Sequence, residues 1–293
     1  MPVPPLRPAA LHQKVFRGSW AVRTGVLTAA SLRSSAWRPV RRDVYVDATV
    51  PDSHVLRATA VGLCMPPGAA LAGRTAAVLW GVTDLVRTDD PVEVAVPVGI
   101  RWTPGPDVVA SSSDLTGATT RQDGRVLTTR LRTAVDLARR AGLLTERVVL
   151  VDRLVRARVV DLPTLRDAVV ALPRCRGSAH AREAVALADG LAESPQETRT
   201  RLVLRAAGVP PPVAQFVVRR DGRFVARVDF AWPARRLALE YDGLWHGDAR
   251  QFARDRARLN ALLAAGWRVL FVTARDLHHP EELAARVCEA LAA

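Results

Sequence analysis

Lysine is nearly absent from this 293-residue sequence, in which Lys14 is the single example. Arginine therefore supplies almost all of the positive charge, and the formal net charge is +13. A surplus of this size excludes an acidic buffer protein or a halophilic surface and favours a polyanionic partner such as nucleic acid. The alternative source of the surplus is a GC-rich genome, which enriches arginine together with alanine, valine, leucine and proline without selection for binding.

Cysteine is also scarce, and Cys64, Cys175 and Cys288 lie far apart. No CxxC or Cys/His pair has the spacing of metal ligands, which excludes a structural zinc site. The apolar runs are short and broken by arginine, well below the ~20 residues that span a bilayer. The N-terminus lacks the apolar core and cleavage site of a signal peptide. We therefore expect a reduced, soluble, cytoplasmic protein with no membrane partner, and 49% hydrophobic residues exclude wholesale disorder.

Residues 1–50 predict a winged-helix-like DNA-binding segment. Its expected elements are a helix over 20–25, a helix from the cap Thr28 through Ala36, and an alternating strand over 40–46. Four arginines stand where such a module meets phosphates, namely Arg33, Arg38, Arg41 and Arg42. The alternative is a solvated arginine face on a small packing unit.

Residues 51–190 predict a region of mixed helices and strands. Its landmarks are a helix over 71–82, a strand over 92–98 and a helix over 133–142. Thr133 and Asp136 have the spacing of a near capping box at the start of that last helix, so this segment needs no functional explanation. We find no catalytic constellation in this region.

Residues 191–293 predict a helix, three strands, a helix, a strand and a final helix. The expected bounds are 194–207, 213–220, 223–232, 236–241, 248–265, 267–272 and 280–291. Asp221-Gly222 is a two-residue hairpin signal between the first two strands. The fold class expected for the chain is therefore α/β (α+β), with an N-terminal winged helix, a mixed middle region and a C-terminal α-β-β-β-α-β core.

Two carboxylates are expected to meet across the second hairpin of this core. If its four-residue loop, Pro-Ala-Arg-Arg, makes Trp232 face Leu237, then Asp229 falls directly opposite Glu240. Two like charges beside an apolar surface are destabilising, and a bound hard cation is the usual remedy. The alternatives are a register shifted by one residue, or an arginine such as Arg227 that neutralises the acids.

Glu197 has two interpretations. Ser194, Pro195 and Glu197 have the pattern of a helix start, with serine as N-cap and glutamate at the third position, which predicts a capping role. At 100° per residue, however, Glu197 shares a helix face with Leu204, so its carboxylate can also point inward as a ligand.

The helix over 248–265 contains the other candidates. Asp255 falls inside its apolar arc, where a buried aspartate needs a cation, an arginine or other donors as partner. His246, shortly after the third strand, can reach the same site. Three arginines at i, i+4 and i+8 form a stripe that either follows a phosphate backbone or is solvated, namely Arg250, Arg254 and Arg258.

Two long segments in the C-terminal part of the sequence resemble a known protein family. VDFAWPARRLALEYDGLWH followed by FARDRARLNALLAAGWRVLFVT resembles the DUF559 branch of the restriction-endonuclease-like PD-(D/E)XK superfamily, which is related to very-short-patch-repair endonucleases. The resemblance covers the chain from ESPQE to the C-terminus. More weakly, the first 190 residues resemble the AbiEi-type antitoxin domain, through FRGSWAVRTGVLTAASL, AAVLWGV and LRTAVDLA.

The resemblance implies that Asp229 and Glu240 hold Mg²⁺ or Mn²⁺. It also assigns the family's helix glutamate to Glu197, its histidine to His246 and its helix aspartate to Asp255. The sequence departs from the superfamily pattern at Asp242, where a lysine often stands, and this leaves the general base open.

Three functions compete at this point. The first is a Mg²⁺-dependent endodeoxyribonuclease that acts on DNA in repair or defence. The second is a DNA-binding regulator, an antitoxin-like repressor with its own promoter or a toxin as partner, whose nuclease fold is vestigial. The third is an interaction module whose arginine content reflects genomic bias alone.

Overall fold

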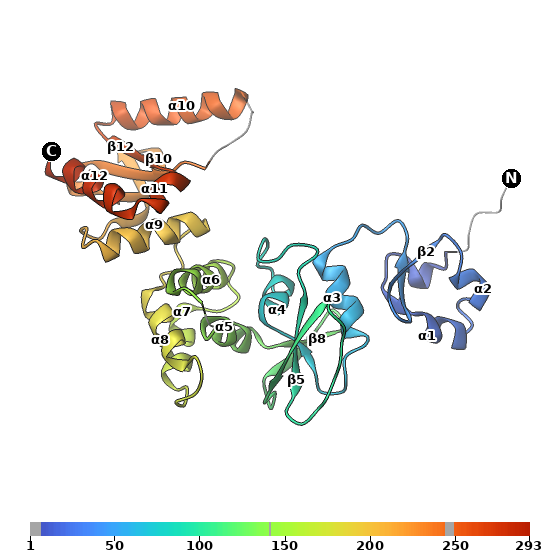
Figure 1. The fold of residues 1–293 in the computed structure, drawn as a ribbon. Coiled ribbons are helices and arrows are strands. Elements are labelled where there is room, and N and C mark those ends of the chain that lie inside the picture. The colour runs from blue at the N-terminus through green and yellow to red at the C-terminus, as the bar shows by residue number, and fades with distance from the viewer. Residues whose placement is uncertain (1–6, 141, 244–248) are drawn as a thin grey trace. The chain divides into compact units, whose positions relative to one another are not determined.

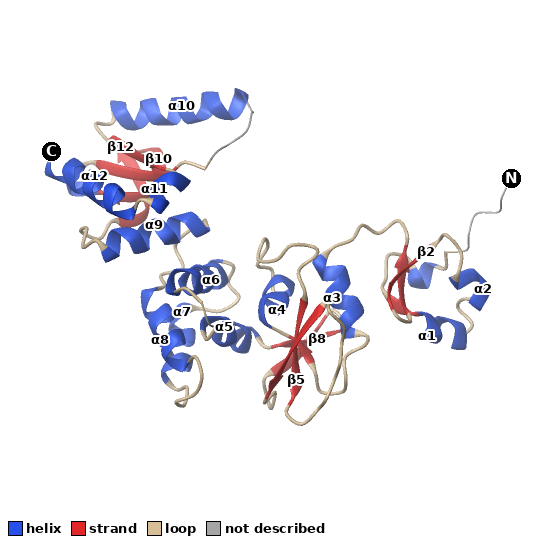
Figure 2. Ribbon diagram, viewed as in Figure 1, coloured by secondary structure: helices blue, strands red, loops and turns tan. Residues whose placement is uncertain are grey.

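The computed structural model describes residues 7–140, 142–243 and 249–293 and divides into two compact units, Met1–Leu137 and Ala138–Ala293 (Figure 1). Both units combine helices with strands, so the expected mixed α and β class is confirmed (Figure 2). Across the described residues, every helix is too short or too polar to span a membrane.

The N-terminal part of the first unit packs short helices against a small sheet with the strand order β1-β3-β2. Its elements are η1 Ala9–Leu11, β1 Phe16–Arg17, α1 Gly18–Arg23, α2 Ala29–Leu32, β2 Trp37–Arg41 and β3 Val44–Asp47. Thr28 caps α2 as predicted, because its hydroxyl accepts the backbone N–H of Ser31 at 3.0 Å. The helix ends at Leu32, earlier than the predicted Ala36.

The single strand predicted over 40–46 is wrong. The chain reverses at Asp43, which adopts a left-handed backbone with φ 60°, and the segment forms the β2–β3 hairpin. The Asp43 carboxylate accepts hydrogen bonds from the backbone N–H and the hydroxyl of Ser19, at 2.7 and 2.5 Å. Aspartate tolerates this conformation because its short side chain finds such local donors.

The rest of the first unit contains a five-stranded sheet with the order β6-β5-β4-β8-β7. The elements are α3 His54–Gly62, β4 Ala70–Leu71, α4 Gly73–Leu79, β5 Val92–Pro97, β6 Val108–Ser113, β7 Thr119–Gln122, β8 Arg125–Thr128 and α5 Arg130–Ala138. The strand predicted over 92–98 is confirmed as β5, whereas Leu71 belongs to β4 and not to a helix. The near capping box is also wrong: Thr133 lies inside α5, where its hydroxyl donates to the carbonyl oxygen of Thr129 at 2.8 Å.

The second unit begins with three packed helices, α6 Leu144–Arg156, α7 Leu162–Val170 and α8 Ser178–Leu187. The remaining elements are α9 Pro195–Ala206, β9 Val213–Arg220, β10 Arg223–Trp232, η2 Pro233–Arg235, β11 Leu237–Tyr241, α10 Ala249–Ala264, β12 Arg268–Val272, α11 Ala274–His278 and α12 Pro280–Ala292. The predicted bounds of β9 and β10 are confirmed, and the observed strands β11 and β12 each begin one residue later than predicted. The short helix α11 was not predicted.

The four strands of this unit form one sheet in the order β12-β11-β10-β9. The two hairpins are antiparallel, and β12 pairs in parallel with β11 after the crossover through α10. Helices cover both faces, with α9 and α12 on one side and α10 on the other (Figure 1). Leu204, Leu239 and Leu283 belong to the core under α9 and α12, whereas Ala238 and Leu262 belong to the core under α10.

A buried aspartate joins the helical part of this unit to α9. Asp152 of α6 is 1% exposed, and its carboxylate accepts four hydrogen bonds at 2.8 to 2.9 Å. The donors are the backbone N–H groups of Asp189 and Gly190, the Thr198 hydroxyl and the Arg201 guanidinium. Because two of these donors belong to α9, Asp152 fixes how that helix packs against α6.

Replacing Asp152 with alanine is expected to lower the free energy of unfolding by about 3 kcal/mol, because buried donors lose their acceptor. Urea denaturation of the full-length protein measures the effect. Asp167→Ala, at an exposed position of α7, is the control and is expected to change stability by less than about 0.5 kcal/mol. A loss no larger than that of the control would contradict the role of Asp152.

Candidate functional site

The predicted register between β10 and β11 is confirmed. Trp232 pairs with Leu237, and the pairing continues through Ala231 with Ala238 and Phe230 with Leu239. One further step along the two strands, just beyond the last paired residues, places Asp229 across from Glu240. Glu240 alternates with Leu239 and lies, like Ala238, on the side of the sheet that α10 covers. The sequence argument from the four-residue loop therefore located this pair of carboxylates.

The Asp229 carboxylate is half-buried and is held by the neighbouring strand. Its Oδ2 accepts the backbone N–H of Tyr241 at 2.8 Å. Burial raises the pKa of Asp229, and the nearby Glu240 charge raises it further, while the hydrogen bond from Tyr241 acts in the opposite direction. Burial also raises the pKa of Glu240, which is 5% exposed.

One of the alternatives stated that an arginine neutralises the acids. This holds for Glu240, but the arginine is Arg258 of α10 and not Arg227. The Arg258 guanidinium donates to both carboxylate oxygens, with N–O distances of 2.7 and 2.6 Å. Its side chain is 40% exposed, whereas that of Glu240 is 6% exposed. Arg227 instead pairs with Glu193 at 2.6 Å.

The structure confirms the capping interpretation of Glu197 and shows that its side chain points inward, whereas its role as a ligand stays a prediction. The Ser194 hydroxyl accepts the Glu197 backbone N–H at 3.2 Å, which confirms the N-cap, and the Glu197 carboxylate accepts the Glu193 N–H at 2.8 Å. The side chain is also buried and lies near the carboxylate pair. Burial raises the pKa of Glu197, and the charges of Asp229 and Glu193 add to this shift.

Gln215 of β9 belongs to the same cluster and was missed. Phe216 pairs with Val228 and Ala214 with Phe230, so Gln215 lies across from Asp229. Its Nε2 donates to the Glu197 carboxylate at 2.9 Å, and its backbone has the unusual φ of 52°.

A bulge explains why the sequence could not locate Gln215. The hairpin turn pairs Arg220 with Arg223, but the register shifts by one residue between Phe224 and Ala226. Counting from the turn alone therefore places Ala214, and not Gln215, opposite Asp229.

The candidates on and before α10 have mixed outcomes. His246 lies outside the described residues, and so does the side chain of Arg250. Asp255 was expected to be buried, but it is exposed, although it lies two turns before the buried Leu262 on the same side of α10. All four residues 254–257 are exposed, so the sheet does not cover this stretch of the helix. The charge of Asp255 still acts on Glu240 and helps to raise the pKa of that group. Arg254 is exposed.

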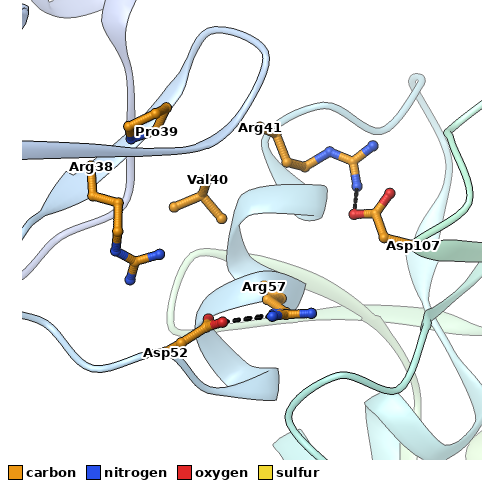
Figure 3. A pocket seen from close by; sticks show the side chains of 7 residues that line it. All are labelled: Arg38, Pro39, Val40, Arg41, Asp52, Arg57 and Asp107. Carbon is orange, nitrogen blue, oxygen red and sulfur yellow. Dashed lines mark hydrogen bonds and ion pairs between the residues drawn. The ribbon is translucent and has the colours of Figure 1, made fainter.

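The four N-terminal arginines divide into two pairs. Arg33 and Arg42 are exposed. Arg38 donates to the carbonyl oxygen of Val50 at 3.2 Å, and Arg41 pairs with Asp107 and the carbonyl oxygen of Pro104. These two arginines line a pocket of about 290 Å³ together with the other residues drawn in Figure 3, namely Pro39, Val40, Asp52, Arg57 and Asp107.

Comparison with known proteins yields relatives without an assigned function. The chain is 35% identical over 173 residues to the uncharacterized proteins MT2308 and Rv2248 of two Mycobacterium tuberculosis strains. The matched segment covers 58% of this chain and 64% of each relative, so the chain spans less than two thirds of their length. No family model matches the chain. No solved structure matches it either.

Asp229→Asn is expected to stabilise the protein at neutral pH, because the raised pKa of Asp229 means that its ionised form destabilises the fold. The loss of stability caused by ionised Asp229 appears as the pH rises through the folded-state pKa of this group, and it vanishes well below that pKa. The difference in Tm between variant and wild type should therefore be larger at about pH 8 than at about pH 4. Asp221→Asn, at a turn position whose side chain is 90% exposed, is the control. A difference independent of pH would contradict this account.

Proposed function

We propose that the chain is a divalent-metal-dependent endodeoxyribonuclease whose C-terminal part is a restriction-endonuclease-like core. The observation that carries the proposal is the pair Asp229 and Glu240 on neighbouring strands, the first half-buried and the second buried, close to the buried Glu197. A fold rarely keeps like charges together in this way without a function for them. The element order from α9 to β12 agrees with the α-β-β-β-α-β core that the family resemblance implies.

The side chains in this cluster suit Mg²⁺ or Mn²⁺, since carboxylate oxygens are the ligands that these hard cations prefer. The charge of Glu240 raises the pKa of Asp229, and the charge of Asp229 raises that of Glu197, so a cation here would relieve their mutual repulsion. Within the described ranges, no group of three or more His, Cys, Asp or Glu side chains is close enough to hold a metal ion. Asp229 and Glu240 are the proposed protein ligands.

When bound, such an ion lowers the pKa of a coordinated water and offsets the charge that develops on the phosphate. The protein's own groups prepare this site. The Tyr241 N–H orients the Asp229 carboxylate, and Gln215 and the Glu193 N–H hold the Glu197 carboxylate. Arg258 offers further guanidinium donors that suit a phosphodiester. His246 remains the proposed proton-transfer group.

The N-terminal segment supports DNA as the partner. Residues 1–50 contain eight Lys or Arg and two Asp, and both Arg33 and Arg42 are exposed there. We propose that this winged-helix-like segment contacts phosphates through these arginines and brings cytoplasmic DNA to the nuclease site.

One observation favours the second candidate, a DNA-binding regulator with a vestigial nuclease fold. Arg258 satisfies both oxygens of Glu240, as a permanent replacement for a lost metal ion would. A footprint on the protein's own promoter, together with no cleavage under any divalent ion, would favour the regulator over the nuclease. Binding of a toxin would identify this regulator as antitoxin-like.

The nuclease proposal predicts nicking of supercoiled or mismatched plasmid DNA with Mg²⁺ or Mn²⁺. Asp229→Asn is expected to reduce the rate more than about a hundredfold, because even the outer partners of metal ligands contribute 10- to 100-fold. The exposed Asp221→Asn serves as the matched control and should retain the wild-type rate. Failure of the wild type to nick any of these substrates would reject the proposal.

DNA binding is expected to weaken steeply with salt. Arg33→Gln and Arg42→Gln should each reduce the slope of log affinity against log salt concentration by about 0.9, the value for one phosphate contact. Arg87→Gln is the control, because its side chain is 83% exposed but lies outside the N-terminal segment. Fluorescence anisotropy with a labelled duplex measures the slopes, and equal slopes for all three variants would exclude this role.

A further inference from the structure

We propose that Arg258 is a displaceable counter-cation: it binds Glu240 while the metal site is empty and turns to a substrate phosphate when a divalent ion takes its place. The inference rests on the proposed nuclease function only in assuming that a divalent ion binds at Asp229 and Glu240. It adds a role for a side chain that the family motifs do not include.

The first step of the argument is the competition for Glu240. Both carboxylate oxygens accept charge-assisted hydrogen bonds from one guanidinium, at 2.7 and 2.6 Å. A divalent ion at the same carboxylate would place a second positive charge beside that guanidinium. The two cations therefore repel each other, and binding of the ion weakens the hold of Glu240 on Arg258.

The second step identifies the partner that moves. Glu240 lies within the paired strand β11, and its side chain is 6% exposed. Arg258 reaches the pair from α10 on a long side chain that is 40% exposed, so its guanidinium can rotate into solvent without a shift of the helix. The arginine is thus the mobile partner and the glutamate the fixed one.

The third step is the new partner of the released guanidinium. Position 242, two residues after Glu240, holds an aspartate, and the single lysine of the chain is Lys14 in the other unit. No lysine of this unit can therefore pair with the phosphate at the site. The guanidinium has the planar, two-pronged geometry that binds a phosphodiester, and it starts next to the carboxylate pair.

The test measures Mn²⁺ binding to the full-length protein without DNA, by isothermal titration and by the electron paramagnetic resonance signal of free Mn²⁺. Arg258→Gln is expected to bind Mn²⁺ about tenfold more tightly than wild type, since the ion no longer displaces a charge-assisted pair. Arg254→Gln removes the same charge one turn earlier on α10, where the side chain is exposed, and is expected to change the affinity less than about twofold.

Arg258→Lys covers the possibility that the glutamine variant does not fold. Lysine keeps the charge but cannot bind both oxygens through a rigid fork, so an affinity between those of wild type and Arg258→Gln is expected. Equal Mn²⁺ affinities for the Arg258 variants and Arg254→Gln, or no Mn²⁺ binding to any of them, would overturn the proposal.

Plasmid cleavage separates this proposal from the nuclease proposal. Arg258→Gln is expected to cleave more slowly than wild type at saturating Mn²⁺, although it binds the ion more tightly, because the phosphate has lost its partner. Faster cleavage by Arg258→Gln would overturn the transfer to phosphate. If no variant cleaves DNA but the difference in Mn²⁺ affinity persists, the nuclease function fails and the displaceable cation stands.

Discussion

Burial of like-charged carboxylates close together on and beside one sheet is the constraint on which the second unit depends. Asp229, Glu240 and Glu197 each have a raised pKa because burial disfavours their ionised forms. The surrounding structure compensates with donors from four different elements or turns: a strand N–H, a side-chain amide, a guanidinium and the N–H before α9. Two of these donors, the Gln215 amide and the Glu193 N–H, share the Glu197 carboxylate, and Arg258 of α10 binds Glu240 of β11, so the cluster ties the sheet to α9 and α10.

The helices α6 to α8 contribute to this arrangement although they carry none of the acids. Asp152 of α6 binds two side chains of α9, and α9 in turn carries Glu197. Arg156 of α6 also pairs with Glu193, whose N–H holds Glu197. The four-stranded sheet and the helical part of this unit are therefore linked through α9 and Glu193, and the contacts that hold the cluster extend to α6.

Sequence reasoning succeeded where local chemistry determines geometry. The four-residue loop set the β10–β11 register and thereby located Asp229 opposite Glu240, and Ser194 marked the start of α9. Sequence reasoning failed where contacts between distant segments determine the geometry. The turn at Asp43 depends on Ser19, which is distant in the chain. The periodicity of α10 placed Asp255 on the side of the buried Leu262, but it could not show that residues 254–257 are left exposed. Arg258 was found as one of a stripe, but its partner Glu240 follows only from the packing of α10 on the sheet.

The bulge between Phe224 and Ala226 has an evolutionary consequence. A one-residue change of register turns every side chain of a strand to the opposite face. Loss of the bulge would leave all the acids of the cluster in the sequence while Gln215 turned away from Glu197. A lineage could therefore lose the contact between Gln215 and Glu197 by a single deletion in a surface hairpin while it retains every motif residue. Motif content alone is thus a poor guide to which descendants keep the site.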